Sequence, residues 1–309
     1  MTLDGRPAHD VADPYRDPGI FARIFPRPSA GEVARALAGA GFPLTQLNLV
    51  AFGLPSLPEP GGPADRRPDY GAIRTAFDGA GVTIWGLSAT FNMIHPDMTR
   101  RRRDGEAARE LVANAARLGA TCVTLCTGTR DPVDMWRAHP ANTAQDAWRD
   151  LREGLEPLLA AAEAGSVRLG IEPEPGNVVR DTVCARRLLD ELGADRCHVG
   201  IVLDPANLLT PGTLVAQEVV LGEAFATLGD DVVCLHAKDV VAGGYAAPGS
   251  GGLDFDLVYR LRQALPRPVP VVVQDTAEDD TPRVRAMLRD HAVARPWTPT
   301  DAGGQGAGH

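Results

Sequence analysis

Four polar side chains stand where buried strands should still be apolar. They are Glu172, Asp204, His236 and Gln274, and each closes a run of apolar residues. A polar residue at the end of a strand that is buried on both faces costs free energy unless it has a partner. For any one of these four residues, a helix cap or a solvated turn is the ordinary explanation. Their spacings of 32, 32 and 38 residues are each close to one strand-helix unit. Four in succession therefore indicate that these side chains meet at one place.

Metal coordination is the chemistry that this set of side chains suits. Two carboxylates, one imidazole and one amide oxygen form a mixed and fairly hard ligand set. Such a set favours Mn²⁺, with Co²⁺, Zn²⁺, Fe²⁺ or Mg²⁺ as alternatives. The pattern predicts a divalent metal site formed by Glu172, Asp204, His236 and Gln274.

The elements that must position these ligands alternate regularly along the chain. Short apolar runs predict strands at 19–25, 44–50, 82–88, 121–127, 167–172, 198–204, 232–237 and 270–275. Amphipathic segments predict helices at 31–40, 101–118, 144–164, 182–192, 214–228, 254–265 and 281–290. Eight such units, with no glycine-rich turn after the first strand, favour a single (β/α)8 TIM barrel over an open, doubly wound sheet.

Loop lengths indicate which end of the barrel carries the site. The segments that leave the strands are long, whereas those that enter them are mostly tight glycine turns. The long segments are 51–69, 89–99, 128–142 and 237–252. We expect them to surround the four predicted ligands.

Residues 18–293 are expected to form one catalytic domain. Residues 1–17 and 294–309 have the proline- and glycine-rich composition of flexible tails. A single barrel of this length is usual, although chains of this size often divide into two domains.

Composition limits the partners of the protein. The chain has 31 Lys and Arg against 40 Asp and Glu, a net charge of −9, which argues against a nucleic-acid partner. No apolar run approaches the roughly 18 residues of a membrane span, and the N-terminus lacks the apolar core of a signal peptide. The five cysteines form no Cys-x-x-Cys pair and indicate reduced thiols. We expect a cytoplasmic protein that acts on a small molecule, and a homodimer is compatible with the sequence.

At four of the strand ends the sequence resembles the xylose isomerase-like sugar phosphate isomerases and epimerases, over about residues 18–292. The resemblance rests on GIEPEPGNVV (170–179), GIVLDPANLL (200–209), CLHAKDVV (234–241) and PVPVVVQDTAEDDTPRVRAML (268–288). It implies a TIM barrel whose fifth, sixth and seventh strands supply metal ligands at Glu172, Asp204 and His236. The segments NMIHPD (92–97) and TLCTGTRDPVDMWRAHPAN (124–142) are similar to those of a bacterial subgroup of this family and indicate no particular substrate.

Gln274 departs from the pattern that the resemblance implies. The eighth strand of the family usually supplies a glutamate, and in its ketose epimerases the glutamates of the fifth and eighth strands also move the proton. An amide oxygen can bind a metal but cannot accept a proton at neutral pH. Epimerisation by two carboxylates is therefore not expected at Gln274.

Three further residues, besides Glu172, are candidates for proton transfer or charge stabilisation. Glu174 points to the same side as Glu172 if the strand continues through Pro173, and it would then act as the base or acid; a salt-bridged residue at the mouth is the alternative. Lys238 would steady an enolate or a phosphate, and a solvated loop lysine is equally compatible. His95 would relay a proton, although a loop histidine is more often simply exposed.

Substrate contacts are expected from residues in the loops at the mouth. Asn207 would bind a hydroxyl or cap the following turn, and Thr127 and Arg130 would contact hydroxyl or phosphate oxygens. His139 is a further polar candidate. Trp136 would form an apolar wall for a sugar ring, although packing under a long loop is the default for an aromatic residue.

These residues predict a metal-dependent isomerase or epimerase that acts on a sugar, keto-sugar or related polyhydroxy carbonyl compound through an enediolate. A dehydratase or lyase that expels a β-leaving group from a keto-sugar or inosose is the first alternative, since elimination needs no base on the opposite face. A non-catalytic sugar-binding barrel is the second. A three-zinc nuclease of the same fold is disfavoured by seven histidines, mostly away from the strand ends, and by the acidic balance.

Overall fold

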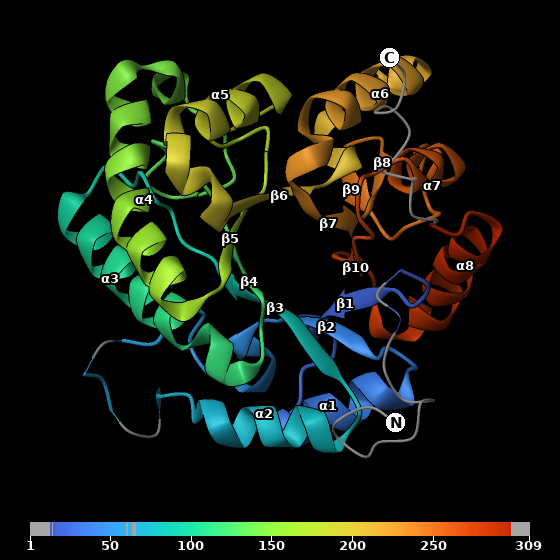
Figure 1. Ribbon diagram of the computed structural model, residues 1–309, viewed down its shortest axis with the longest axis horizontal. Coiled ribbons are helices and arrows are strands. Elements are labelled where there is room, and N and C mark those ends of the chain that lie inside the picture. Colours follow the sequence, from blue (N-terminus) through green and yellow to red (C-terminus); the bar gives the residue numbers. More distant parts are fainter. Residues whose placement is uncertain (1–12, 14, 60, 64–65, 298–309) are drawn as a thin grey trace, which may run out of the picture.

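The computed structural model describes residues 13, 15–59, 61–63 and 66–297. Eight parallel strands close into a barrel in the order β1-β10-β7-β6-β5-β4-β3-β2 (Figure 1). The barrel strands are β1 (Gly19–Phe21), β2 (Leu44–Leu47), β3 (Thr83–Ala89), β4 (Cys122–Leu125), β5 (Arg168–Ile171), β6 (Val199–Leu203), β7 (Val232–Ala237) and β10 (Val271–Val273). Ile20 of β1 pairs with Thr45 of β2 on one side and with Val273 of β10 on the other, which completes the ring. The predicted (β/α)8 TIM barrel is confirmed.

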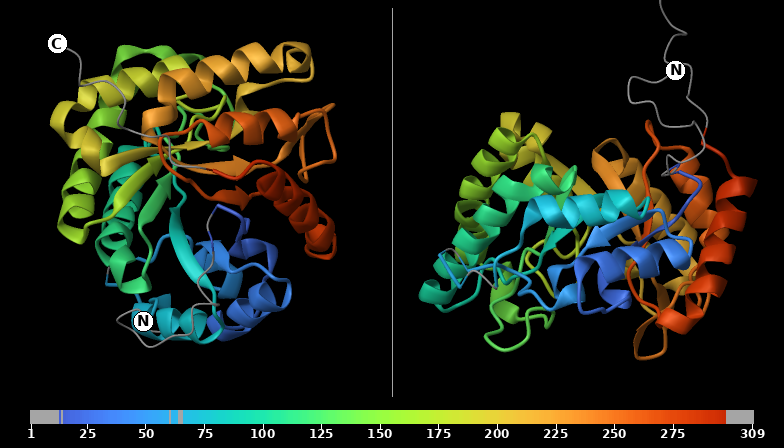
Figure 2. Two further views of the ribbon diagram at one scale, coloured as in Figure 1. Left: turned by 45° about the vertical axis from the view of Figure 1, so that its right-hand side comes forward. Right: turned by 90° about the horizontal axis from the view of Figure 1, so that it is seen from below.

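Within the described part of the chain, eight α-helices surround the strands (Figures 1 and 2). They are α1 (Ala30–Gly39), α2 (Tyr70–Gly79), α3 (Met98–Asn114), α4 (Gln145–Gly165), α5 (Thr182–Leu192), α6 (Gln217–Leu228), α7 (Phe255–Gln263) and α8 (Thr281–Ala294). Aspartates cap several N-termini by accepting a backbone N–H, namely Asp69, Asp97, Asp181 and Asp254. Seven of the helices were expected from the sequence. The eighth, α2, follows the proline-rich loop and buries Tyr70, Ile73 and Phe77 along one face.

The hydrophobic core has two parts, as a barrel requires. A large cluster fills the space between strands and helices. A smaller one, made of Phe21, Val202, Cys234 and Val272, gathers side chains of four different strands. The Phe21 ring also meets the His236 ring edge-on, with centroids 5.0 Å apart. The second cluster therefore supports the predicted metal site directly.

The loop after β7 contains a short hairpin that the sequence did not predict. It consists of β8 (Asp239–Val241) and β9 (Gly244–Ala246) in antiparallel pairing. The buried carboxylate of Asp239 accepts backbone N–H groups from Val240, Gly251 and Leu253, at 2.8 to 2.9 Å. This fixes the loop against the barrel mouth.

Part of the predicted N-terminal tail packs on the barrel. Tyr15 is buried, its hydroxyl donates to the carbonyl of Arg295 at 3.0 Å, and the Arg262 guanidinium lies 3.7 Å from its ring centroid. Residues 1–12, 14 and 298–309, which make up most of the two predicted tails, lie outside the described residues.

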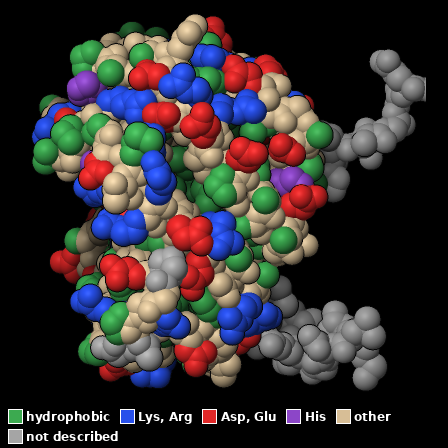
Figure 3. Space-filling model, turned by 90° about the vertical axis from the view of Figure 1, so that its left-hand side faces the viewer, with side chains coloured by type: hydrophobic (Ala, Val, Ile, Leu, Met, Phe, Trp, Pro, Cys, Tyr) green, Lys and Arg blue, Asp and Glu red, His purple; other side chains and the backbone are tan. Residues whose placement is uncertain are grey.

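The surface over α3 and α4 carries charges of both signs (Figure 3). Arginines there pair with nearby acids, as Arg109 does with Glu106 and Arg130 with Asp150. On this face the positive charges are therefore interspersed with negative ones. Across the described residues, no helix combines the length and apolar character that crossing a bilayer requires.

Candidate metal centre and active site

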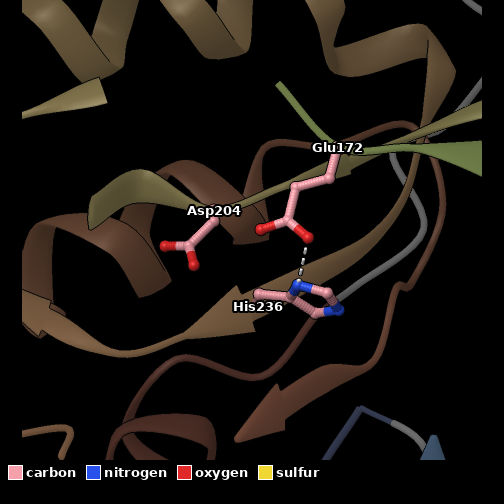
Figure 4. A group of neighbouring side chains, drawn as sticks. All are labelled: Glu172, Asp204 and His236. Carbon is pink, nitrogen blue, oxygen red and sulfur yellow. Dashed lines mark ion pairs between the residues drawn. The ribbon is translucent and has the colours of Figure 1, made fainter. Parts of the chain in front are cut away.

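Three of the predicted ligands converge at the mouth of the barrel. Glu172 directly follows β5, Asp204 directly follows β6, and His236 lies near the end of β7. All three are buried, and one ligand atom of each lies within 4.8 Å of the other two. Their side chains point toward one another (Figure 4). The carboxyl ends of adjacent parallel strands meet at one edge, which is why residues 32 positions apart in sequence become neighbours.

Two atoms of this group have no hydrogen bond within the described structure. His236 Nδ1 lies 3.1 Å from Glu172 Oε2, and Asp204 Oδ2 lies 3.2 Å from Lys238 Nζ, but neither contact has hydrogen-bond geometry. Leaving a buried polar atom unsatisfied costs about 1–3 kcal/mol, so two at one point call for an explanation. A shared divalent cation would satisfy both, and the residues present fit such an ion.

A hydrogen-bonded chain from β2 sets the orientation of His236. Gln46 Nε2 donates to the hydroxyls of Ser88 at 2.8 Å and Thr124 at 2.9 Å. Its Oε1 therefore faces His236 Nε2, at 2.9 Å. An amide oxygen only accepts, so Nε2 carries a proton, and in the neutral ring Nδ1 then presents a lone pair toward the carboxylates. This is the tautomer that a metal ligand needs.

We expect Gln46→Leu to weaken Mn²⁺ binding by about 10–100-fold, because partners of this kind hold the ligand imidazole in place. The measurement is a calorimetric titration of the metal-free protein with Mn²⁺. Thr45→Val is the matched control, since Thr45 is the neighbouring buried residue and donates instead to the carbonyl of Ile20. Equal affinities in Gln46→Leu and the wild type would exclude this role for Gln46.

Neighbouring side chains also orient the two carboxylates. Asn207 Nδ2 donates to Glu172 Oε1 at 2.9 Å and to the carbonyl of Pro173 at 3.2 Å. Asp204 Oδ1 accepts the backbone N–H of Ala206 at 2.9 Å, which leaves Oδ2 facing Lys238. Asn207 thus holds Glu172 while also lining the cavity described below.

Burial and mutual charge control ionisation in this group. Burial raises the pKa of Asp204 to about 6, with Lys238 opposing the shift. Burial acts in the same direction on Glu172, but His236 and Lys238 outweigh it and lower the pKa of Glu172. Burial would lower the pKa of Lys238, yet the carboxylates of Asp204 and Glu172 raise it above the ordinary value. The group therefore holds a lysine cation beside two carboxylates that favour a second cation.

A cavity of about 540 Å³ reaches this group at Glu172. Glu172, Glu174 and Gln274 line it, together with Lys238 and Asn207. Gln274 follows β10, and its Oε1 is buried with no hydrogen bond among the described residues, so its role as the fourth ligand stays a prediction.

Glu174 reaches the cavity by a turn and not by strand extension. The sequence placed it beside Glu172 on the condition that the strand persisted, but β5 ends at Ile171. The backbone turns instead, with Asn177 N–H donating to the Glu174 carbonyl at 2.9 Å. Burial and the neighbouring Glu172 carboxylate raise the pKa of Glu174 to about 8, and its Oε2 is buried with no partner in the described part of the chain.

Four other predicted site residues are engaged in holding loops. His95 accepts the Asp97 N–H at Nδ1 and contacts the Pro132 carbonyl through Nε2. Thr127 accepts the Val179 N–H, and His139 caps a short 3-10 helix by accepting the Ala141 N–H. Arg130 pairs with Asp150 and donates to the Ile94 carbonyl. None of the four is among the residues that line the central cavity. Trp136 does line it.

Sequence reasoning missed the inner polar residues of the first strands. Gln46, Ser88 and Thr124 come from β2, β3 and β4 and form a hydrogen-bonded set beneath the cavity. Gln46 is only 1% exposed, and a polar residue inside the apolar run LTQL was the available signal. Arg23, Asn48, Tyr245 and Asp275 also line the cavity and were not singled out.

The sequence matches the xylose isomerase-like TIM barrel family over residues 34–289. The chain belongs to this family. A comparison with curated proteins gives no match. The resemblance seen in the sequence motifs is thus confirmed at the level of the family.

Solved structures with the same fold include several sugar epimerases. The 3-keto-D-glucoside 4-epimerase of E. coli shares 18% identity and covers 88% of this chain and 98% of its own, with a TM-score of 0.68. The D-allulose 3-epimerase of Methylomonas sp. shares 13% identity over 89% of this chain and 97% of its own, with a TM-score of 0.65. The IOLI protein, solved with a bound zinc atom, shares 12% identity and covers 90% of this chain and 99% of its own, with a TM-score of 0.61. At these identities the likeness is one of fold.

Proposed function

We propose that this protein is a divalent-metal-dependent isomerase or epimerase that acts on a keto-sugar or related polyhydroxy carbonyl compound. The observation that carries the proposal is the buried triad of Glu172, Asp204 and His236, whose ligand atoms lie within 4.8 Å of one another, next to a cavity that Glu172 lines. The sugar epimerases of the same fold support the substrate class, and the zinc in the IOLI structure supports the metal. Mn²⁺ suits the mixed ligand set best.

The chain divides the chemistry among a few side chains. A bound divalent ion would supply Lewis-acid polarisation of a carbonyl and an adjacent hydroxyl. Glu174, with its free carboxylate oxygen in the cavity, takes the proton from the carbon beside the carbonyl and returns it. Lys238 places positive charge where the substrate oxygen becomes negative, and Asn207 keeps Glu172 in position.

The neutral Gln274 decides which proton transfer is favoured. A second base on the opposite face would be needed for direct inversion at one carbon, and Gln274 cannot serve as one. Glu174 acting alone returns the proton to the face from which it took it, which suits transfer between neighbouring carbons. The same arrangement also suits elimination of a β-leaving group, so a dehydratase or lyase is the second candidate.

Deuterium incorporation separates these functions. The Mn²⁺-loaded protein is incubated in D₂O with a set of keto-sugars and inososes, and the products are examined by NMR and mass spectrometry. We expect deuterium in recovered or isomerised sugar at a carbon next to the carbonyl. Loss of water or of an aglycone would instead identify a lyase. If a metal-loaded protein showed neither deuterium exchange nor elimination, both catalytic functions would be excluded and a non-catalytic binding barrel would remain.

Replacing Gln274 with glutamate tests whether its amide faces the ion. Gln274→Glu adds a third carboxylate to the ligand set, so we expect Mn²⁺ to bind about tenfold more tightly, because ligand charge count tunes affinity. The measurement is the Mn²⁺ titration used for Gln46. An unchanged affinity would place Gln274 outside the ligand set, and activity gained from none would favour the binding barrel.

A further inference from the structure

A second cavity adjoins the central cavity. This second cavity has a volume of about 420 Å³ and lies under the loops that follow β2, β3 and β4. Ser56, Thr90 and Trp136 line both cavities, so the two spaces meet at these three residues. Single cavities of about 300–1,000 Å³ hold drug-sized ligands, so the combined space exceeds what one sugar ring fills.

Trp136 stands at the junction on a firmly held loop. Its side chain is 56% exposed, although tryptophan is normally well buried. Asn142 Nδ2 donates to the Gly176 carbonyl at 2.9 Å, and Asn177 Nδ2 donates to the Met135 carbonyl at 3.3 Å. A Cβ on Gly176 would lie 1.9 Å from the Trp136 carbonyl oxygen, so the two loops are in direct backbone contact. An exposed indole held this way offers a flat apolar surface to a ligand.

The charges of the second cavity select against an anionic ligand. Its lining includes three carboxylates, Asp104, Asp131 and Asp134, and the guanidinium of Arg100. All three carboxylates are already paired with arginines: Asp104 with Arg100 and Arg103, and Asp131 and Asp134 with Arg137. A phosphate would have to compete with these carboxylates for the guanidinium groups, whereas the hydroxyls of a neutral sugar can donate to the carboxylates.

We propose that the substrate is a neutral glycoside of two units, with the second ring stacked on Trp136 and seated in the second cavity. The reacting ring then lies between Glu172, Glu174 and Lys238. The identity of the reacting ring rests on the proposed function, but the binding of the second ring does not. The loops after β2, β3 and β4 set specificity, while β5 to β10 carry the chemistry.

The test compares the binding of one-ring and two-ring neutral sugars by calorimetry, with and without Mn²⁺. The probes are maltose, cellobiose, lactose, sucrose and trehalose, each against the methyl glycosides of its component rings, with trehalose 6-phosphate as the charged probe. We expect at least one disaccharide to bind about tenfold more tightly than its methyl glycosides, since an aromatic contact contributes about 0.5–1.5 kcal/mol. Trehalose 6-phosphate should bind no better than trehalose.

Variants at the junction assign the effect to the second cavity. Trp136→Ala should remove the disaccharide advantage, measured as the ratio of disaccharide affinity to methyl glycoside affinity, and Trp136→Phe should keep most of it. Ser56→Phe, which narrows the junction, should lower the same ratio. Val215→Ala is the control, because Val215 is 95% exposed and lines neither cavity.

Two results would overturn the proposal: no disaccharide preferred over its single rings, or a preference that survives both Trp136→Ala and Ser56→Phe. Neither result bears on metal binding or deuterium exchange. Conversely, if the protein prefers disaccharides but does not bind metal or exchange deuterium, the proposed function is excluded while binding of the second ring still stands.

Discussion

Asp204→Asn is expected to lower Mn²⁺ affinity by about a hundredfold or more. Four ligands of a structural zinc site share about 10–16 kcal/mol, so one ligand is worth about 3 kcal/mol. Asparagine keeps the shape of the side chain and can still accept the Ala206 N–H, but it removes the negative charge that faces Lys238. The measurement is calorimetric titration of the metal-free protein.

Asp231→Asn provides the matched control for Asp204→Asn. Asp231 is also a buried aspartate and also binds cations, namely Arg186 and Arg196, but it lies before β7 at the opposite end of the barrel. It should lose folding stability without losing metal affinity. Equal Mn²⁺ affinity in Asp204→Asn and the wild type would remove Asp204 from the ligand set.

Glu174→Gln is expected to slow deuterium exchange into the substrate by about 10²–10⁴-fold, the usual contribution of a positioned acid or base. The amide preserves size and the contact with Cys126 but cannot accept a proton. Because Glu174 lies outside the triad, Mn²⁺ affinity should stay close to that of the wild type. The two readouts together distinguish proton transfer from metal binding.

The control for Glu174→Gln is Glu153→Gln on the exposed side of α4, where the side chain is 65% exposed. It should exchange deuterium at the wild-type rate. Exchange by Glu174→Gln at the wild-type rate would assign the proton transfer to another residue, with Glu172 the next carboxylate in the cavity.

The barrel and the convergence of its three candidate ligands could be predicted from the sequence because both follow from local patterns. A short apolar run predicts each strand, and the carboxyl ends of successive parallel strands meet at one edge of the barrel. Glu172, Asp204 and His236 needed only this rule to be placed together. The strand bounds were less certain: the apolar run of 19–25 is a strand only to Phe21 and then turns into a 3-10 helix.

The partners of loop side chains could not be predicted, because they come from loops far away in the sequence. His95 and Arg130 were predicted near a substrate, and the sequence does not reveal their contacts with the Pro132 carbonyl and with Asp150. Gln46 lies 190 residues before His236 and contacts it only through closure of the barrel. No periodicity in the sequence encodes such a pair.

The most direct test of the central claim is a crystal structure of the protein grown with Mn²⁺ and measured at the manganese edge. We expect one anomalous peak per chain, within coordination distance of a Glu172 carboxylate oxygen, Asp204 Oδ2 and His236 Nδ1. A protein that binds no ion there, with these three side chains still packed against one another, would contradict it.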